Sequence, residues 1–244
     1  MSWSTIPDSD MKLSATAEKA IQAYGGSGLW EKARSIEAVI TANGLAFTLK
    51  RRPAFRRAKF TAEIHRPFAC MTPIGARAEV AGVLDGVDVR LENSAGELLE
   101  ERKNARSYFP FGRRLFSWDD LDMAYFANYA TWNYLTLPAL LMNDQIQWSE
   151  KRPGFLEAFF PESIPTHNRL QTFQFDLESG RLIQHNYAPA IISKFANAAN
   201  VVKEHNQGDV LFTSHRIVTP QGFGGKPMGG PILIDLTIHE FQIR

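Results

Sequence analysis

The residues best suited to acid–base or metal chemistry are six histidines, and they are spread singly along the chain. They are His65, His167, His185, His205, His215 and His239. No two of them have the HxH or HExxH spacing that places two imidazoles on one metal ion, so the sequence predicts no metal site. His185 alternates with Tyr187 along one expected strand, and His205 and His215 lie on neighbouring expected strands. A strand histidine is either a structural group or an acid–base group, and both interpretations stay open here.

Other catalytic signatures are incomplete. Gly25-Gly26-Ser27-Gly28 follows an expected helix and not a strand, so it does not form a nucleophile elbow. The loop Gly222–Pro227 has the glycines of a phosphate loop, but proline follows Lys226 and no helix opens there. The single cysteine, Cys70, excludes an internal disulfide and a zinc site made of thiolates. We therefore expect no catalytic residue that can be named, no metal and no cofactor.

The most informative segment is the expected helix Asp119–Leu135. Three aspartates stand at its start, where the helix dipole favours negative charge, and no charged residue follows up to Leu137. At 100° per residue, one face holds Leu121, Tyr125, Tyr129 and Trp132, and the other holds Met123, Phe126, Ala127, Ala130 and Tyr134. A helix that is apolar nearly all round must be covered nearly all round. Either it is sandwiched between a sheet and another element, or one face meets the sheet and the other lines a cavity.

Two further segments allow more than one interpretation. The aromatic loop, Ser107–Trp118, contains Phe109 and Phe111 and forms either the rim of the core or a movable lid over a pocket. The basic segment Lys50–Lys59 contains only one aromatic residue, Phe55, so a solvated turn is favoured over a nucleic-acid surface.

Alternating apolar and polar residues predict strands on both sides of the central helix. Before it we expect a helix capped by Ser9 or Asp10 and running to about Tyr24. Strands are then expected at Ile36–Thr41, in the run after Gly44 that includes Phe47 and Leu49, and at Phe60–Ile64, Glu79–Leu84, Val87–Glu92 and Glu97–Ala105. After it they are expected at Gln145–Trp148, Phe155–Phe160, Leu170–Phe175, Arg181–Tyr187, Asn200–His205, Val210–Thr219 and Ile232–Phe241. Strands joined by hairpins, with segregated helices, indicate an α+β fold with an antiparallel sheet of about ten or eleven strands.

Composition limits the class of protein. The chain has 244 residues, is 44% hydrophobic and 22% charged, and carries a formal net charge of +1. Such a chain can bury a large core, and it has no overall field to attract nucleic acid or an anionic membrane. Because the first ten residues lack the pattern of a secretory signal and no long apolar run occurs, we expect a cytoplasmic protein with no stable membrane insertion. We expect residues 1–244 to form a single domain.

The order of these elements resembles the LolA/LolB-like superfamily of lipoprotein carriers, as a bacterial branch of it. Arg51-Arg52-Pro53-Ala54-Phe55-Arg56 looks like the basic turn after the second strand of that family, and Val83–Val87 looks like the hairpin that follows. Gly208–Phe212 looks like the entry to the last strands. The resemblance implies an incomplete barrel whose concave face is filled by helices, with an apolar cavity that receives acyl chains. It carries over no catalytic residue, and the export signal and lipid-accepting cysteine of the carriers are not seen here.

We therefore expect non-catalytic binding of a hydrophobic small molecule or lipid between the curved sheet and the central helix. The expected ligand-binding residues are Phe109, Phe111, Tyr125, Phe126, Asn128, Tyr129, Trp132 and Tyr134. The alternative is an enzyme that acts on a hydrophobic small molecule with a strand histidine as acid or base. A third is a structural or partner-binding domain without a cavity. A histidine hydrogen-bonded to a tyrosine or carboxylate inside a pocket would favour the enzyme. Neither the ligand nor a protein partner can be named from the sequence.

Overall fold

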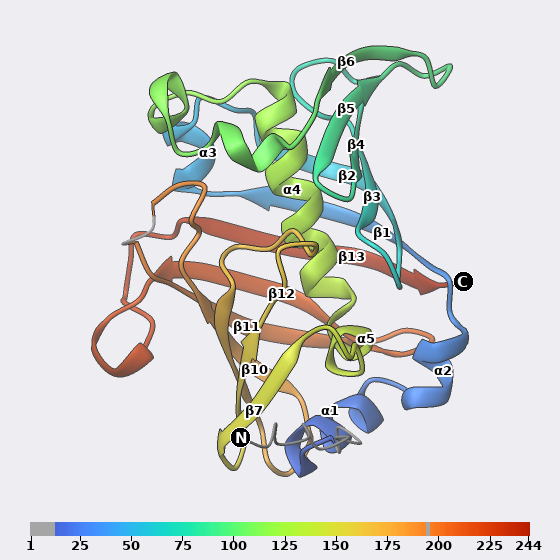
Figure 1. The fold of residues 1–244 in the computed structure, drawn as a ribbon, viewed down its shortest axis with the longest axis vertical. Helices are drawn as coiled ribbons and strands as arrows, with labels where there is room; N and C mark the ends of the chain where they lie inside the picture. The colour runs from blue at the N-terminus through green and yellow to red at the C-terminus, as the bar shows by residue number, and fades with distance from the viewer. Residues whose placement is uncertain (1–12, 194–195) are drawn as a thin grey trace, which may run out of the picture.

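The structure, a computed structural model, describes residues 13–193 and 196–244. In this part of the chain, thirteen strands form one antiparallel sheet that curls around a long helix (Figure 1). The strands of the first half are β1 (Ser35–Asn43), β2 (Phe55–Glu63), β3 (Phe68–Thr72), β4 (Ala81–Asp85), β5 (Asp88–Glu92) and β6 (Leu98–Arg102). Those of the second half are β7 (Gln147–Arg152), β8 (Phe155–Phe159), β9 (Leu170–Phe175), β10 (Leu182–Tyr187), β11 (Ala198–Gln207), β12 (Leu211–Pro220) and β13 (Ile234–Ile243).

The helices are fewer and are grouped on one side of the sheet or at its ends. The α-helices are α1 (Ala15–Ala23), α2 (Ser27–Lys32), α3 (Leu45–Leu49), α4 (Asp120–Leu135) and α5 (Leu137–Leu141). Short 3₁₀ turns are η1 (Ala105–Tyr108), η2 (Gly112–Leu115) and η3 (Phe223–Gly225).

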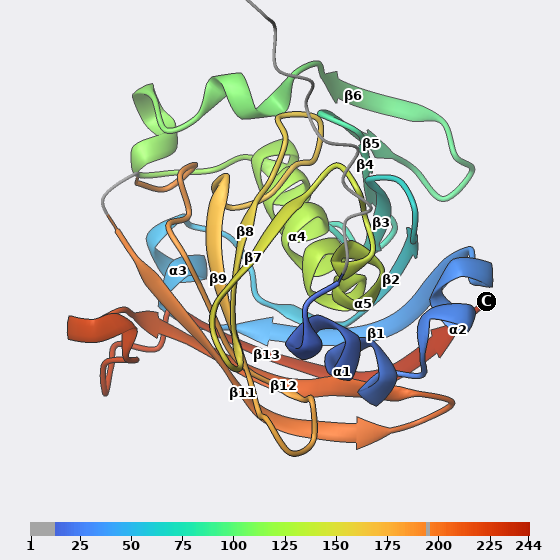
Figure 2. The same cartoon turned by 60° about the horizontal axis from the view of Figure 1, so that its bottom comes forward.

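The sheet is built as two meanders that meet in its middle. Strands β1 to β6 lead outward to one edge, the chain crosses through α4 and α5, and β7 to β13 lead back from the other edge. β13 then pairs with β1, so Ala38 lies opposite Phe241. Because β6 and β7 remain edges, the sheet is an incomplete barrel, and the expected α+β fold with a curved antiparallel sheet is confirmed (Figure 2).

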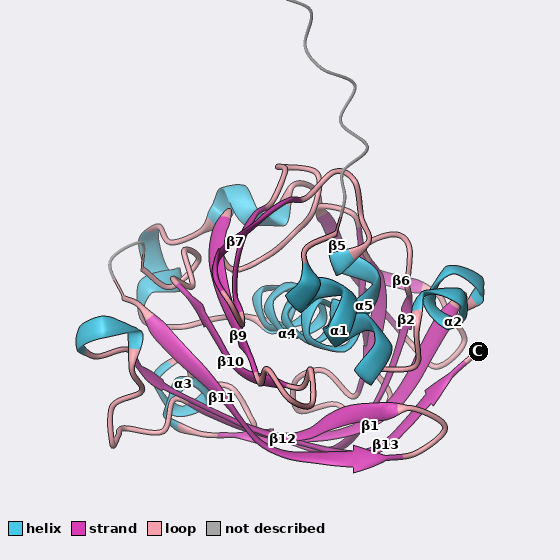
Figure 3. Ribbon diagram, turned by 90° about the horizontal axis from the view of Figure 1, so that it is seen from below, coloured by secondary structure: helices cyan, strands magenta, loops and turns pink. Residues whose placement is uncertain are grey.

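Helix α4 lies on the concave face of the sheet, surrounded by strands and by α1 and α5 (Figure 3). The side chain of Asp119 accepts a hydrogen bond from the Asp122 amide, and the Asp122 side chain accepts one from the Asp119 amide. This capping box fixes where the helix begins, as the acidic start predicted. Along the helix, Trp132 Nε1 donates to the carbonyl of Glu63 at 2.7 Å, which ties α4 to the end of β2.

Helix and sheet approach each other most closely at Gly82 of β4. A Cβ at this position would lie 2.6 Å from Cβ of Ala124 and 2.6 Å from Cγ1 of Ile74, closer than packed side chains tolerate. The carbonyl of Gly82 also accepts a hydrogen bond from Asn128 Nδ2 at 2.9 Å. The absence of a side chain at Gly82 therefore lets α4 rest directly on the backbone of β4.

Two local expectations and the expected number of strands differ from the structure, and one further expectation lies outside the described residues. The strand expected after Gly44 is wrong, because the chain turns at this glycine (φ 125°) against the carbonyl of Leu233 and forms α3. A run of five residues is too short for its periodicity to separate helix from strand. Strand β3 was not expected, because both of its faces carry apolar residues and the alternation of apolar and polar residues is lost. The sheet also has more strands than the ten or eleven expected. The expected caps Ser9 and Asp10 lie outside the described residues, and the described helix α1 is capped by Ser14.

Candidate ligand-binding cavity

A largely apolar cavity of about 420 Å³ lies at one end of the half-barrel, and we call it the main cavity. This volume is within the range of about 300–1,000 Å³ typical of small-molecule sites. It is lined by Ala46, Leu49, Lys50, Phe126, His167, Tyr187, Pro189, Ile192, Ala196, Asn197, Ala198, Val218, Pro220, Gln221, Leu233 and Ile234. Leu49, Ala196 and Asn197 are exposed, whereas His167, Tyr187 and Val218 are buried. The cavity therefore runs from the protein surface into the core.

The buried end of the main cavity carries a hydrogen-bonded group of one histidine and three tyrosines. The Tyr134 hydroxyl lies 2.9 Å from His167 Nε2 and 2.6 Å from the Tyr187 hydroxyl. The Tyr129 hydroxyl lies 3.2 Å from His167 Nδ1. A neutral imidazole has one N–H and one bare nitrogen, so His167 donates to one tyrosine and accepts from the other. We call these four side chains the His167 cluster.

The His167 cluster is uncharged at neutral pH. Burial, together with the positive charge of Arg106, lowers the pKa of His167 to about 3. Burial raises the pKa of Tyr134 to about 12, although a hydrogen bond with Tyr187 and the charge of Arg216 act in the opposite direction. The rings of His167 and Tyr187 stack with their centres 3.7 Å apart, which fixes both at the cavity wall. The cluster thus offers hydrogen bonds to a guest without a formal charge.

Elements distant in sequence hold the cluster in place. Arg106 of η1 donates to the carbonyls of Thr166 and His167 at 2.6 and 2.9 Å, and so fixes the segment that carries the histidine. Tyr134 comes from the last turn of α4, and Tyr187 ends β10. Behind them, His185 stacks on Phe173 and its Nε2 lies 2.6 Å from Gln171 Oε1.

Lys50 is the one charged side chain in the lining of the main cavity, among the residues that the structure describes. It is 6% exposed, and its ammonium donates to the carbonyls of Arg114 and Leu115 at 3.0 and 2.8 Å. The ammonium also lies 5.3 Å from the centre of the Trp118 ring. Lys50 therefore attaches the aromatic loop to the end of α3, which corrects the expectation that the basic segment is wholly a solvated turn.

A second, smaller cavity of about 40 Å³ lies between α4 and the sheet. Phe126, Tyr187 and Ile234 line both this space and the main cavity, so the two adjoin. Ala127, Ala130 and Tyr134 also border the smaller space, and all are on the face of α4 that carries Phe126. The cavities thus follow this face of the helix.

The structure separates the expected ligand-binding residues into different environments. Phe126 lines the main cavity. Tyr134 and Tyr129 do not line it, but their hydroxyls are hydrogen-bonded to His167, which does. Tyr125 instead borders another pocket, of about 520 Å³, together with Arg106. Asn128 donates to the carbonyls of Gly82 and Ala124, both at 2.9 Å, and is fully buried.

The remaining three expected residues lie away from the main cavity. Trp132 is 1% exposed and hydrogen-bonded to the end of β2, so it packs in the core. Phe109 stacks on Tyr125 with ring centres 6.1 Å apart, whereas Phe111 is 68% exposed. Tyr125, Tyr129 and Trp132 therefore do not border the main cavity together, although this was expected. The cavities follow the opposite face of α4, which carries Phe126.

No pattern in the sequence indicates that His167, Tyr187 and Lys50 line the same cavity. His167 lies in the connection between β8 and β9 and not on a strand, and no motif marked it. The alternation of His185 with Tyr187 was the available signal, and their rings do lie close, with centres 4.8 Å apart. The other expected pair does not form, since His205 contacts Tyr24 and His215 contacts Asp235.

Comparison with known proteins addresses the fold. No protein-family model matches the chain, and no curated protein matches it significantly. The crystal structure of a LolA superfamily protein from Nitrosomonas europaea is similar, with a TM-score of 0.51 and 9% identity over 94% of this chain and 92% of that one. The chain has a LolA-like fold. This confirms the resemblance proposed from the sequence at the level of architecture.

Two other solved structures overlap with this chain at a lower TM-score. A DUF1329 family protein from Desulfovibrio piger gives a TM-score of 0.49 at 9% identity, over 95% of this chain and 92% of that one. A domain from Vibrio parahaemolyticus, assigned to outer membrane lipoprotein sorting, gives 0.49 at 11% identity, over 94% and 91%.

Within the described residues, no group of three or more metal-ligating side chains is assembled. In that same part, no helix is both long and apolar enough to cross a membrane. The chemistry of the main cavity is therefore that of apolar walls with the His167 cluster at one end.

Proposed function

We propose that this protein binds a hydrophobic or lipid-like ligand in the main cavity. One observation carries the proposal: an apolar cavity of about 420 Å³ leads from exposed residues to the buried His167 cluster. Leu233, Ile234 and Val218 would contact the apolar part of the ligand, and each buried CH₂ contributes about 0.8 kcal/mol before ordering costs. The Tyr187 hydroxyl would hydrogen-bond its polar group, because Tyr129 and Tyr134 already engage both ring nitrogens of His167.

The proposal predicts that the purified protein carries a bound hydrophobic molecule. It also predicts that replacing Ala46 by tryptophan prevents this molecule from binding. Ala46 lies on α3 and lines the main cavity, so Ala46→Trp places an indole in the ligand space. Thr48→Trp adds the same side chain at an exposed position of the same helix and serves as the matched control. We expect mass spectrometry of organic extracts to show a ligand with wild type and Thr48→Trp, and at least a tenfold lower amount with Ala46→Trp.

The result that contradicts binding in this cavity is equally direct. If wild type yields no molecule above the level of a control protein purified in the same way, the proposal fails. It also fails if the Ala46→Trp variant, folded as judged by circular dichroism, retains the same amount of ligand as wild type.

A second candidate is an enzyme that moves a proton on such a ligand, and the His167 cluster favours it. An imidazole hydrogen-bonded to two tyrosines at a cavity wall is an arrangement suited to acid–base chemistry. The lining of the main cavity, over the residues that the structure describes, contains no serine, threonine or cysteine. Proton transfer on the ligand therefore fits the site better than acyl transfer through a nucleophile.

One experiment distinguishes the binding protein from the enzyme, and it uses the organic extract of the wild-type protein as the probe. An enzyme would change the mass or chromatographic retention of a component during incubation with wild type but not with His167→Gln. Under the binding proposal, the extract is recovered unchanged after incubation with either protein. A change produced equally by both proteins would exclude His167 as the acid–base group.

A further inference from the structure

Arg216 is a cation in the interior of the half-barrel. It is 1% exposed and lies on β12, close to the end of α4. Its Nε and Nη2 donate to the Thr213 hydroxyl at 3.0 and 2.8 Å, and Nη2 also donates to the Tyr134 carbonyl at 3.4 Å. The guanidinium lies 4.8 Å from the centre of the Tyr134 ring.

The charge of Arg216 is not compensated by an acidic side chain. Arg216 forms no ion pair within the described residues. Arg102 is the other arginine there with less than a tenth of its side chain exposed, and it is paired with both Asp119 and Asp122. Nη1 of Arg216 has no hydrogen-bond partner among the described residues. A buried charge without a counter-ion is strongly unfavourable, so such groups in native proteins are normally paired with an opposite charge.

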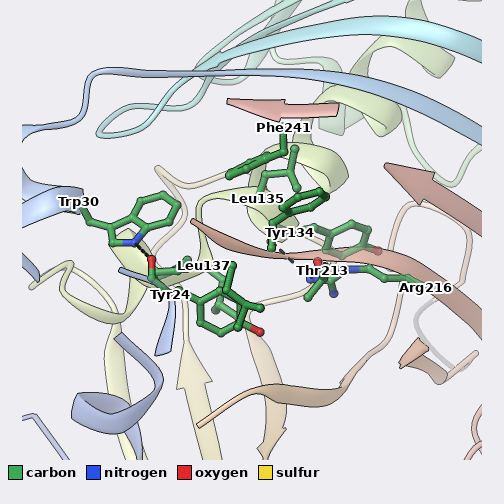
Figure 4. Close-up of a pocket in the computed structure, with 11 residues that line it drawn as sticks. Tyr24, Trp30, Tyr134, Leu135, Leu137, Thr213, Arg216 and Phe241 are labelled. Atoms are coloured by element: carbon green, nitrogen blue, oxygen red, sulfur yellow. Dashed lines mark hydrogen bonds between the residues drawn. The ribbon is translucent and has the colours of Figure 1, made fainter. Parts of the chain in front are cut away.

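A small space adjoins this guanidinium (Figure 4). It has a volume of about 20 Å³, enough for one particle the size of a water molecule or a monatomic ion. Arg216 and Thr213 lie on one side of it, and Trp30 and Tyr24 lie on the other. The Thr213 hydroxyl accepts both hydrogen bonds from Arg216, which leaves its own hydrogen available to a guest.

We infer that this space, which we call the Arg216 pocket, binds a small monovalent anion of halide size. The free N–H groups of Nη1 and the Thr213 hydroxyl supply hydrogen bonds, and the guanidinium supplies the opposite charge. The rest of the lining is largely apolar and aromatic, and it includes Tyr134 and Phe241. None of these residues lines the main cavity, although Tyr134 also belongs to the His167 cluster.

Thermal unfolding in different sodium salts at constant ionic strength tests the inference on the wild-type protein. Relative to gluconate, bromide and chloride are expected to raise Tm with the logarithm of their concentration above Kd, by about 5–10 °C at one hundred times Kd. Sulfate, which is too large for the Arg216 pocket, is expected to give no such increase. Crystals grown in bromide are expected to show an anomalous peak beside Nη1 of Arg216.

Two variants make the test specific. Arg216→Met keeps the length of the side chain and removes its charge, so the dependence of Tm on bromide should disappear. Arg56→Met, at an exposed position, controls for the general loss of a positive charge and should respond as wild type does. Equal Tm of wild type in gluconate and bromide overturns the inference, because a water molecule then suffices. Stabilisation by acetate or formate but not by halide also overturns it.

Discussion

Lowering the pH from 7 to 4.5 is expected to reduce the free energy of unfolding by about 2.5 kcal/mol through His167, with a further loss through His185. Burial and the charge of Arg106 lower the pKa of His167 to about 3. Burial, aided by the nearby His167 and Arg216, also places the pKa of His185 well below its ordinary value. Urea denaturation at a series of pH values measures the effect, which is a substantial fraction of the total stability of many domains.

The direction of this effect follows from where the protons bind. In the unfolded chain both histidines take up a proton near pH 6.5, whereas in the folded protein they stay neutral. The free energy of unfolding is therefore unaffected above about pH 7. Below it, His167 removes about 1.4 kcal/mol per pH unit down to about pH 3, and His185 acts in the same direction. His205, whose pKa is lowered to about 4 by burial, adds a smaller contribution because its ring is partly exposed.

Glutamine variants connect the pH dependence to particular residues. His167→Gln and His185→Gln should each reduce the slope between pH 6.5 and 4.5. A wild-type stability that is flat over this range would contradict the neutral, buried state of the His167 cluster.

Asp122→Ala is expected to destabilise the fold by about 3–5 kcal/mol. The Asp122 carboxylate is fully buried and accepts hydrogen bonds at 2.6 Å from both Arg102 and Arg114. Its removal leaves the buried guanidinium of Arg102 with Asp119 as its remaining partner and also breaks the capping box of α4. Urea denaturation at pH 7 measures the loss.

Surface ion pairs provide the matched control for this prediction. Arg66 pairs with Glu63 and Asp85, but its side chain is 50% exposed, so Arg66→Ala should cost less than about 1 kcal/mol. If Asp122→Ala costs no more than Arg66→Ala, then the carboxylate does not hold the start of α4 as the structure indicates.

The elements that the sequence predicted well are those whose signal is local. Alternation in Ile36, Ala38 and Ile40 predicted β1, because one face of that strand is buried and the other is not. The aspartates at 119–122 predicted the start of α4, since capping depends on neighbours three residues apart. The absence of charge along α4 also predicted correctly that this helix is covered on nearly every side.

The position of the cavity was not available from the sequence. Both faces of α4 are apolar and aromatic, so composition could not show which face packs on β4 and which follows the cavities. That choice is made at Gly82, where the missing side chain admits the helix against the sheet.

The amino-acid sequence alone therefore determined the α+β class, the antiparallel meanders and the covered helix, because each depends on residues close together in the chain. Only the tertiary structure decided the members of the site. Tyr134 hydrogen-bonds to His167 and to Tyr187, which lie 33 and 53 positions away in the chain, and Arg216 forms no ion pair among the described residues. Contacts of this range depend on how the sheet curls and on the register of its strands, and a pattern along the chain does not encode them locally.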